Sequence, residues 1–147
     1  MIDAQTYSLL ADIARRESRT LLQYVHDSFP WTTPEEKDRV AQIQTLIEEE
    51  KQGLTDLMRF ILGQHQPLPY IGSYPTSFTG LSFVSLDHLI PLLATHERED
   101  YHRLEREVGA LSSPEAKEVV QKILDRKRRH LEILQSLAAN RSQPAVV

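Results

Sequence analysis

The chain of 147 residues contains no cysteine. Disulfide bonds and thiolate chemistry are therefore excluded, and any metal site must be built from carboxylate or imidazole ligands. No apolar run is long enough to span a membrane. The first residues also lack the basic and apolar regions of a signal peptide. From these absences we expect a cytoplasmic protein with no membrane partner.

Positive charge is outnumbered by negative charge, with 17 Lys and Arg against 21 Asp and Glu and a net charge of −4. Such a balance does not favour binding to nucleic acid, so we expect no nucleic-acid partner. The run of basic residues at 126–129 is interpreted as a solvated helix face, with Lys127 as its one inward member. The chain length and its 40% hydrophobic content fit one domain with a sizeable core.

What the chain does contain is four stripes of apolar residues, spaced by alternating steps of three and four. This spacing predicts the inward faces of packed α-helices. The helices are expected over about residues 3–28, 33–62, 85–109 and 113–139. Short connections make two antiparallel helix hairpins, and a long crossover over 63–84 joins them. We therefore predict an all-α, four-helix domain over 1–139, followed by a disordered tail over 140–147.

Charged residues interrupt these stripes at one depth. Glu17, Glu50 and Glu97 each occupy a core position of a stripe, and the fourth stripe carries Lys127 and His130 at the matching level. Buried charges are costly unless they are paired or bind a metal. Bundles build their sites from inward polar groups on facing helices. We therefore predict that these five side chains converge in the interior.

The stripes and their inward charged residues make the chain over about 3–139 resemble the ferritin-like superfamily. The resemblance is closest to the rubrerythrin-type and small bacterial members of that superfamily. The resemblance implies a four-helix bundle in which two helices each supply a glutamate and two each supply a Glu-x-x-His motif. Together these ligands hold two iron or manganese ions. Glu17 and Glu97 match the two single glutamates of the family.

The two Glu-x-x-His motifs are each incomplete. Glu50 begins the motif of the second helix, but Gly53 stands where the histidine is expected. In the fourth helix His130 is retained, and Lys127 stands where the glutamate is expected. The resemblance therefore implies a degenerate metal site. An ammonium group at this position would repel two metal ions.

Several arrangements of this site stay open at the level of sequence. The first is a metal-free cluster in which Lys127 compensates the buried glutamates. The second is one Fe, Mn or Zn ion held by Glu17, Glu50, Glu97 and His130, with Lys127 turned away. A dinuclear site would need further ligands such as Gln52 or water. A helix register shifted by one residue would instead turn Glu49 and Gln52 inward.

The long connection contains no charged residue from Gln64 to Leu86. We expect it to be an ordered strap on the side of the bundle, and the alternative is a dimer or partner surface. The preferred interpretation is a non-catalytic ferritin-like protein that binds no cofactor, forms a homodimer and has an interaction or accessory role. It assigns no catalytic residue. The alternative is a metal-binding protein with redox or metal-storage activity.

Overall fold

The computed structural model of this chain describes residues 1–27, 32–81 and 84–139. The described residues form five α-helices and two 3₁₀ turns, with no β-strand among them. This confirms the all-α fold predicted from the apolar stripes. No helix in the described part combines the length and the apolar content that crossing a membrane requires. The tail over 140–147 lies outside the described residues.

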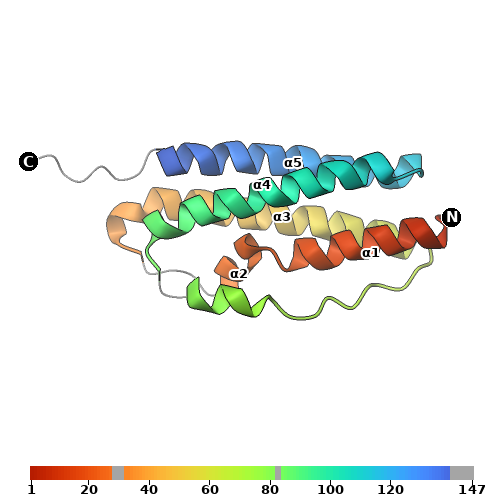
Figure 1. Ribbon diagram of the computed structural model, residues 1–147, viewed down its shortest axis with the longest axis horizontal. Coiled ribbons are helices and arrows are strands. Elements are labelled where there is room, and N and C mark those ends of the chain that lie inside the picture. The colour runs from red at the N-terminus through yellow and green to blue at the C-terminus, as the bar shows by residue number, and fades with distance from the viewer. Residues whose placement is uncertain (28–31, 82–83, 140–147) are drawn as a thin grey trace, which may run out of the picture.

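Four long helices lie side by side along the long axis of the molecule (Figure 1). The helix bounds are Ala4–Ser18 for α1, Leu21–Asp27 for α2, Lys37–Gly63 for α3, Leu86–Ala110 for α4 and Pro114–Ala139 for α5. Helix α3 packs against α1 and α5, and α4 packs against α5. The chain runs in the same direction along α3 and α4, and in the opposite direction along α1 and α5 (Figure 1).

The first helix differs from the sequence prediction, which placed one continuous helix over 3–28. The structure ends α1 at Ser18 and begins α2 at Leu21, because Arg19 leaves the helical region with φ −123° and ψ 27°. Thr20 then acts as a cap, since its Oγ1 accepts a hydrogen bond of 3.2 Å from the backbone N–H of Gln23. The capped break makes five helices where four were predicted.

Helix starts elsewhere follow the capping residues of the sequence. The 3₁₀ turn Pro34–Glu36 precedes α3, and the Thr33 backbone N–H donates to Glu36 Oε1 at 2.9 Å. Before α4, the Ser85 side chain accepts from the His88 backbone N–H. Each of these bonds satisfies a donor that a helix end would otherwise leave free.

The apolar core has two halves with polar side chains between them. One half joins α2 and the 3₁₀ turn η2 (Thr76–Leu81) to the first part of α3 and α4 and the last part of α5. The other half joins α1 to the remaining parts of α3, α4 and α5. On α5, for example, Leu124 belongs to one half and Leu134 to the other. We call the buried polar residues at this level the polar layer: Glu17, Thr20, Gln23, Glu50, Glu97, Lys127 and His130.

The crossover packs on the helices of its own chain. Its 3₁₀ turn η2, Thr76–Leu81, buries Phe78 against the ring of Tyr24 on α2, with ring centroids 5.6 Å apart. Along α1, the hydroxyl group of Tyr7 donates to the Pro67 carbonyl at 2.8 Å, and Arg15 Nε donates to the Tyr70 carbonyl at 3.0 Å. These bonds hold the irregular segment that precedes η2 against α1.

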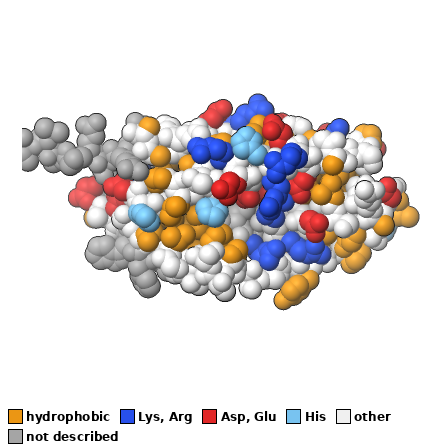
Figure 2. Space-filling model, in the orientation of Figure 1, with side chains coloured by type: hydrophobic (Ala, Val, Ile, Leu, Met, Phe, Trp, Pro, Cys, Tyr) orange, Lys and Arg blue, Asp and Glu red, His pale blue; other side chains and the backbone are white. Residues whose placement is uncertain are grey.

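The surface above the polar layer is rich in charge. On the face drawn in Figure 2, Lys and Arg side chains form a band across the middle, and hydrophobic side chains gather on either side of it. Arg103 and Arg106 of α4 line one open depression. A neighbouring depression, which Arg103 also borders, is lined by Arg15 and Arg16 of α1 and by Arg19 just beyond its end. The guanidinium group of Arg16 reaches inward, with Nε 3.7 Å from Glu17 Oε1.

Candidate functional site

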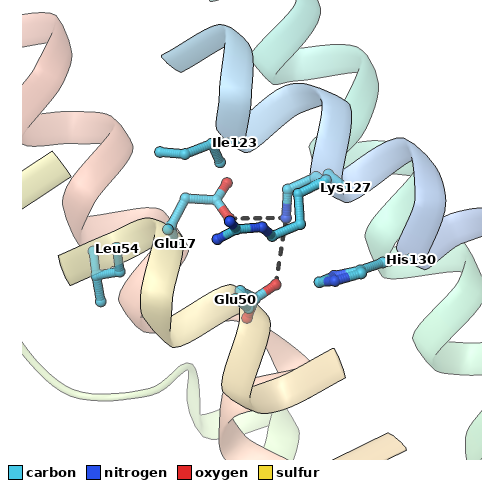
Figure 3. A pocket seen from close by; sticks show the side chains of 8 residues that line it. Glu17, Glu50, Leu54, Ile123, Lys127 and His130 are labelled. Atoms are coloured by element: carbon cyan, nitrogen blue, oxygen red, sulfur yellow. Dashed lines mark hydrogen bonds and ion pairs between the residues drawn. The ribbon is translucent and has the colours of Figure 1, made fainter. Parts of the chain in front are cut away.

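The ammonium group of Lys127 lies among three buried carboxylates. Its Nζ is 2.8 Å from Glu17 Oε2, 3.5 Å from Glu50 Oε2 and 3.5 Å from Glu97 Oε2. These four side chains come from α5, α1, α3 and α4, and each is between 2% and 6% exposed. Figure 3 shows Lys127 reaching Glu17 and Glu50 from the facing helix. We call these four residues the carboxylate cluster.

The helices place the cluster where the stripe pattern predicts it. Each member continues the apolar face of its own helix, and apolar layers lie on both sides along the bundle axis. On α3, for example, Glu50 lies between buried Ile47 and Leu57. Water is therefore largely excluded, so the charges must be balanced by one another.

Glu50 is the carboxylate of the cluster whose hydrogen-bonding capacity is best satisfied. The hydroxyl group of Thr20 donates to Glu50 Oε1, and Gln23 Nε2 donates to the same oxygen at 3.0 Å. Gln23 Nε2 also donates to the Ile47 carbonyl at 3.1 Å. The stripe pattern predicted neither donor, although Thr20 and Gln23 follow Glu17 at steps of three residues. The helix break before α2 is what presents them to Glu50.

His130 is buried beside the cluster but does not contact its carboxylates closely. Its Nε2 lies 3.4 Å from Glu49 Oε2, a carboxylate that also lies 3.4 Å from Arg129 Nη2. Burial lowers the pKa of His130, so the imidazole is neutral at neutral pH. Glu50 is the buried member of the adjacent pair, and Glu49 is more exposed, which places α3 in the first of the two registers considered.

The position opposite Gly53 is occupied by a cation. Arg126 Nη1 donates to the Glu49 carbonyl at 2.8 Å, and a Cβ atom at Gly53 would lie 3.2 Å from the same nitrogen. That Cβ would also lie 3.5 Å from Ile123 Cγ1. The space in which the resemblance expects a histidine ligand therefore holds a guanidinium group. Nothing in the stripe pattern of the sequence predicted this placement.

A second arginine flanks the cluster between α1 and α4. Arg16 forms a bidentate ion pair with Glu107, in which Nη1 donates to Oε2 at 3.1 Å and Nη2 donates to Oε1. The Nε atom of Arg16 also lies 4.0 Å from Asp100 Oδ1. Burial raises the pKa of Asp100 against the opposing effects of Lys127 and Arg16. Both acidic residues add negative charge near Glu17, and Arg16 offsets part of that charge.

The three buried glutamates have different proton affinities. Burial raises the pKa of Glu17 to about 6, against the opposing charge of Lys127. Burial, with repulsion from Glu50 and Glu17, raises the pKa of Glu97 well above its ordinary value. Burial also favours a higher pKa for Glu50. The charge of Lys127 and the hydrogen bonds from Thr20 and Gln23 outweigh this effect, so the pKa of Glu50 is lowered. Glu50 is therefore the carboxylate that stays ionised most readily.

These shifts set the order in which the carboxylates take up a proton. Glu97, whose pKa is raised well above its ordinary value, is protonated most readily, and Glu50, whose pKa is lowered, is protonated least readily. Burial opposes the charge on Lys127, but the three surrounding carboxylates outweigh it and raise the pKa of Lys127 well above its ordinary value. A protonated lysine has no lone pair for nucleophilic attack or base catalysis. The cluster is thus an ion-paired arrangement around a charged lysine.

Some oxygens of the cluster lack directed hydrogen bonds. Among the described residues, neither oxygen of Glu17 accepts a hydrogen bond, and Glu97 Oε2 also accepts none. The 2.8 Å contact between Glu17 and Lys127 is therefore a close ion pair whose donor geometry is poor. Buried oxygens without a donor cost free energy, so this part of the site is incompletely satisfied.

The residues in this arrangement do not fit a metal ion. The ammonium of Lys127 contacts all three carboxylates, and His130 faces Glu49. Within residues 1–27, 32–81 and 84–139, no group of three or more His, Asp or Glu side chains is arranged to hold a metal. A metal held by Glu17, Glu50, Glu97 and His130 would require Lys127 to turn away, and it stays a prediction.

Comparison of this chain with protein-family models, with curated proteins and with solved structures finds no match.

Proposed function

We propose that this chain is a ferritin-like four-helix bundle in which the ammonium of Lys127 replaces the metal ions, and that it acts through interactions rather than catalysis. The observation that carries the proposal is the placement of Lys127 Nζ within 3.5 Å of three buried carboxylates. The fold assignment is supported by the long crossover, which leaves α3 and α4 running in the same direction (Figure 1). One long crossover is typical of ferritin-like bundles.

Electrostatics explain why Lys127 and a metal compete for the same place. At an effective dielectric constant of about 20, a divalent ion about 4 Å from an ammonium group is repelled by on the order of 8 kcal/mol. Arg126 adds a further positive group beside Gly53. A metal would bind only after the lysine side chain had left the carboxylates.

The proposal is tested by measuring metal binding directly. We expect the purified parent protein to contain no stoichiometric metal by elemental analysis. We also expect no stoichiometric uptake when Mn(II), Zn(II) or anaerobic Fe(II) is titrated into it in a calorimeter. Tight binding of one ion per chain by the parent would overturn the proposed replacement of metal by Lys127.

The second candidate function is metal binding with redox or storage activity. It is favoured by the buried oxygens of Glu17 and Glu97 that accept no hydrogen bond from the described residues, because such oxygens are available to a cation. In this case Glu17, Glu50, Glu97 and His130 would hold one Fe, Mn or Zn ion. The same titration decides between the two candidates.

The interaction role is proposed to begin with a homodimer. Leu68 and Tyr70 of the crossover are 49% and 86% exposed, and such uncharged aromatic surface is typical of interface cores. Analytical ultracentrifugation should show a dimer for the parent and a shift towards monomer for the Leu68→Ser and Tyr70→Ser double variant. A parent that sediments as a monomer at every concentration would contradict this part of the proposal.

A further inference from the structure

The open depression between α1 and α4 gathers arginine side chains on an acidic chain. The residues that line it are Asp12, Arg15, Arg16, Arg19, Arg103 and Glu107. Four guanidinium groups against two carboxylates leave an excess of positive charge there, although the net charge of the whole chain is −4. The depression is therefore a local exception to the overall charge, and it is the place on this face where a negative group would be attracted.

Both carboxylates of the depression are already paired. Arg15 Nη1 donates to Asp12 Oδ1 at 2.8 Å, and Arg16 forms its bidentate pair with Glu107. Fork-to-fork pairing of this kind is how a guanidinium group recognises a carboxylate. The positive excess of the depression therefore lies on the two remaining arginines.

Those two arginines, Arg19 and Arg103, have no carboxylate partner among the described residues. Arg19 is held by neutral acceptors, since its Nε donates to the Arg15 carbonyl at 3.1 Å and its Nη1 to the Ser73 carbonyl at 3.4 Å. Arg103 is exposed and forms neither a hydrogen bond nor an ion pair with the described part of the chain. Arg19 is thus held in position with its charge unneutralised, and Arg103 is free to meet a partner.

We propose that this depression binds an acidic segment of a partner protein, and that Arg19 and Arg103 each pair with one carboxylate of that segment. The proposal rests on the interaction role proposed above and names the chemistry of the partner. Arginine is enriched in protein–protein interfaces, and it is one of the residues on which their binding energy concentrates.

The shape and the charges of the depression favour a protein segment over other anions. Sites for small molecules enclose most of the ligand surface, whereas this depression is open to solvent. Asp12 and Glu107 lie among the arginines, so a continuous polyanion such as nucleic acid would meet like charge there. A protein segment can place single carboxylates at the two arginines and leave uncharged residues beside the acidic ones.

Binding of an acidic peptide, measured by fluorescence anisotropy, tests the proposal. The probe is a fluorescent peptide of alternating Glu and Ala residues, and a Lys–Ala peptide of the same length is the charge control. The parent is compared with Arg103→Gln and with Arg59→Gln, which changes the net charge by the same amount. Arg59 is the matched control because it is 76% exposed on α3 and lies 4.0 Å from Asp56.

Arg103→Gln should weaken binding of the acidic peptide by about three- to tenfold, the effect of losing one charged pair. Arg59→Gln should bind the peptide as the parent does, and the Lys–Ala peptide should not bind. Because Arg103 makes no contact of its own that the fold would lose, its variant should fold. Arg19→Gln should weaken binding to a similar extent, and the two effects should multiply in the double variant.

Four results would overturn the proposal. They are no saturable binding of the acidic peptide by the parent, an equal loss in Arg103→Gln and Arg59→Gln, tighter Arg103-dependent binding of a single-stranded oligonucleotide of equal charge, and a shift of Arg103→Gln towards monomer in sedimentation. The last result would make a second copy of the chain the occupant. A monomeric parent that binds the peptide through Arg103 would support the acidic partner while removing the homodimer proposed through Leu68 and Tyr70.

Discussion

Replacing Lys127 with methionine removes the cation that three buried glutamates share. Lys127 is 2% exposed, and its Nζ lies 2.8 Å from Glu17 and 3.5 Å from both Glu50 and Glu97. Methionine has a similar volume and no charge, so the variant keeps the packing and loses the ion pairs. Glu50 then remains ionised in an apolar surrounding with only neutral donors.

The expected loss of stability is large for one substitution. Breaking a buried ion pair by removing one partner costs about 3–5 kcal/mol of the free energy of unfolding, because a buried charge is left uncompensated. For a chain of this length, that loss lowers the melting temperature by roughly 6–20 °C. The close contact with Glu17 places Lys127→Met towards the upper part of this range.

The stability that Lys127→Met loses should depend on pH, and it should be larger at high pH than at low pH. Burial raises the folded-state pKa of Glu17 to about 6 even with Lys127 present, and removing the lysine raises it further. A raised folded-state pKa contributes stability that is complete below the ordinary value of about 4.5 and is lost as pH rises through the folded value. The deficit of Lys127→Met relative to the parent should therefore grow as pH rises above about 6 and should shrink as pH falls towards and below that value.

Urea denaturation of the parent and the variant, at neutral and at acidic pH, measures this difference. Lys122→Met is the matched control, because Lys122 lies on the same helix, is 73% exposed and is 3.8 Å from Glu118. An exposed pair of this kind contributes at most about 1 kcal/mol. If Lys127→Met were as stable as the parent at neutral pH, the compensating role of the lysine would be refuted.

Two further predictions concern the same cluster. Glu97→Gln mimics a carboxyl group that keeps its proton and should retain most of the parent stability at neutral pH, whereas Glu50→Gln removes an ionised group and should cost about 1–3 kcal/mol by denaturation. A more stable Glu50→Gln than Glu97→Gln would reverse our assignment of the proton. The combined variant Gly53→His, Lys127→Glu and Arg126→Ala rebuilds both Glu-x-x-His motifs and clears the guanidinium, and it should bind two Mn(II) or Fe(II) ions per chain by calorimetry. A folded variant that takes up no more metal than the parent would show that our helix register or ligand assignment is wrong.

The sequence alone predicted the all-α fold and the side chains that the helices bring together. The steps of three and four residues define an inward face, so a glutamate that obeys those steps must share that face with the leucines around it. The stripes therefore predict Glu17, Glu50, Glu97 and Lys127 at one level, and in the structure the lysine contacts all three glutamates. Helix periodicity depends only on the order of residues within one helix, so it can be determined from the sequence alone.

Other features depend on contacts between helices and could not be predicted in this way. The break before α2 is stabilised by the cap of Thr20 and by its hydrogen bond to Glu50, 30 residues away in sequence. His130 obeys the inward spacing, yet it faces Glu49 because the side-chain direction depends on the neighbouring helix. Arg126 was interpreted as solvated, and its guanidinium instead turns towards Gly53. Periodicity identifies a face of a helix but not the partner of each side chain.

The polar layer between the two apolar halves of the core has a consequence for how the helices align. Leucine-lined faces tolerate sliding, because one apolar contact replaces another at similar free energy. A slide of α5 by one turn, about 5.4 Å, would instead carry the ammonium of Lys127 away from its carboxylates and into an apolar layer. The polar layer therefore fixes the axial register of the four long helices. All four contribute to the layer, and only one register brings Lys127 to its three carboxylates.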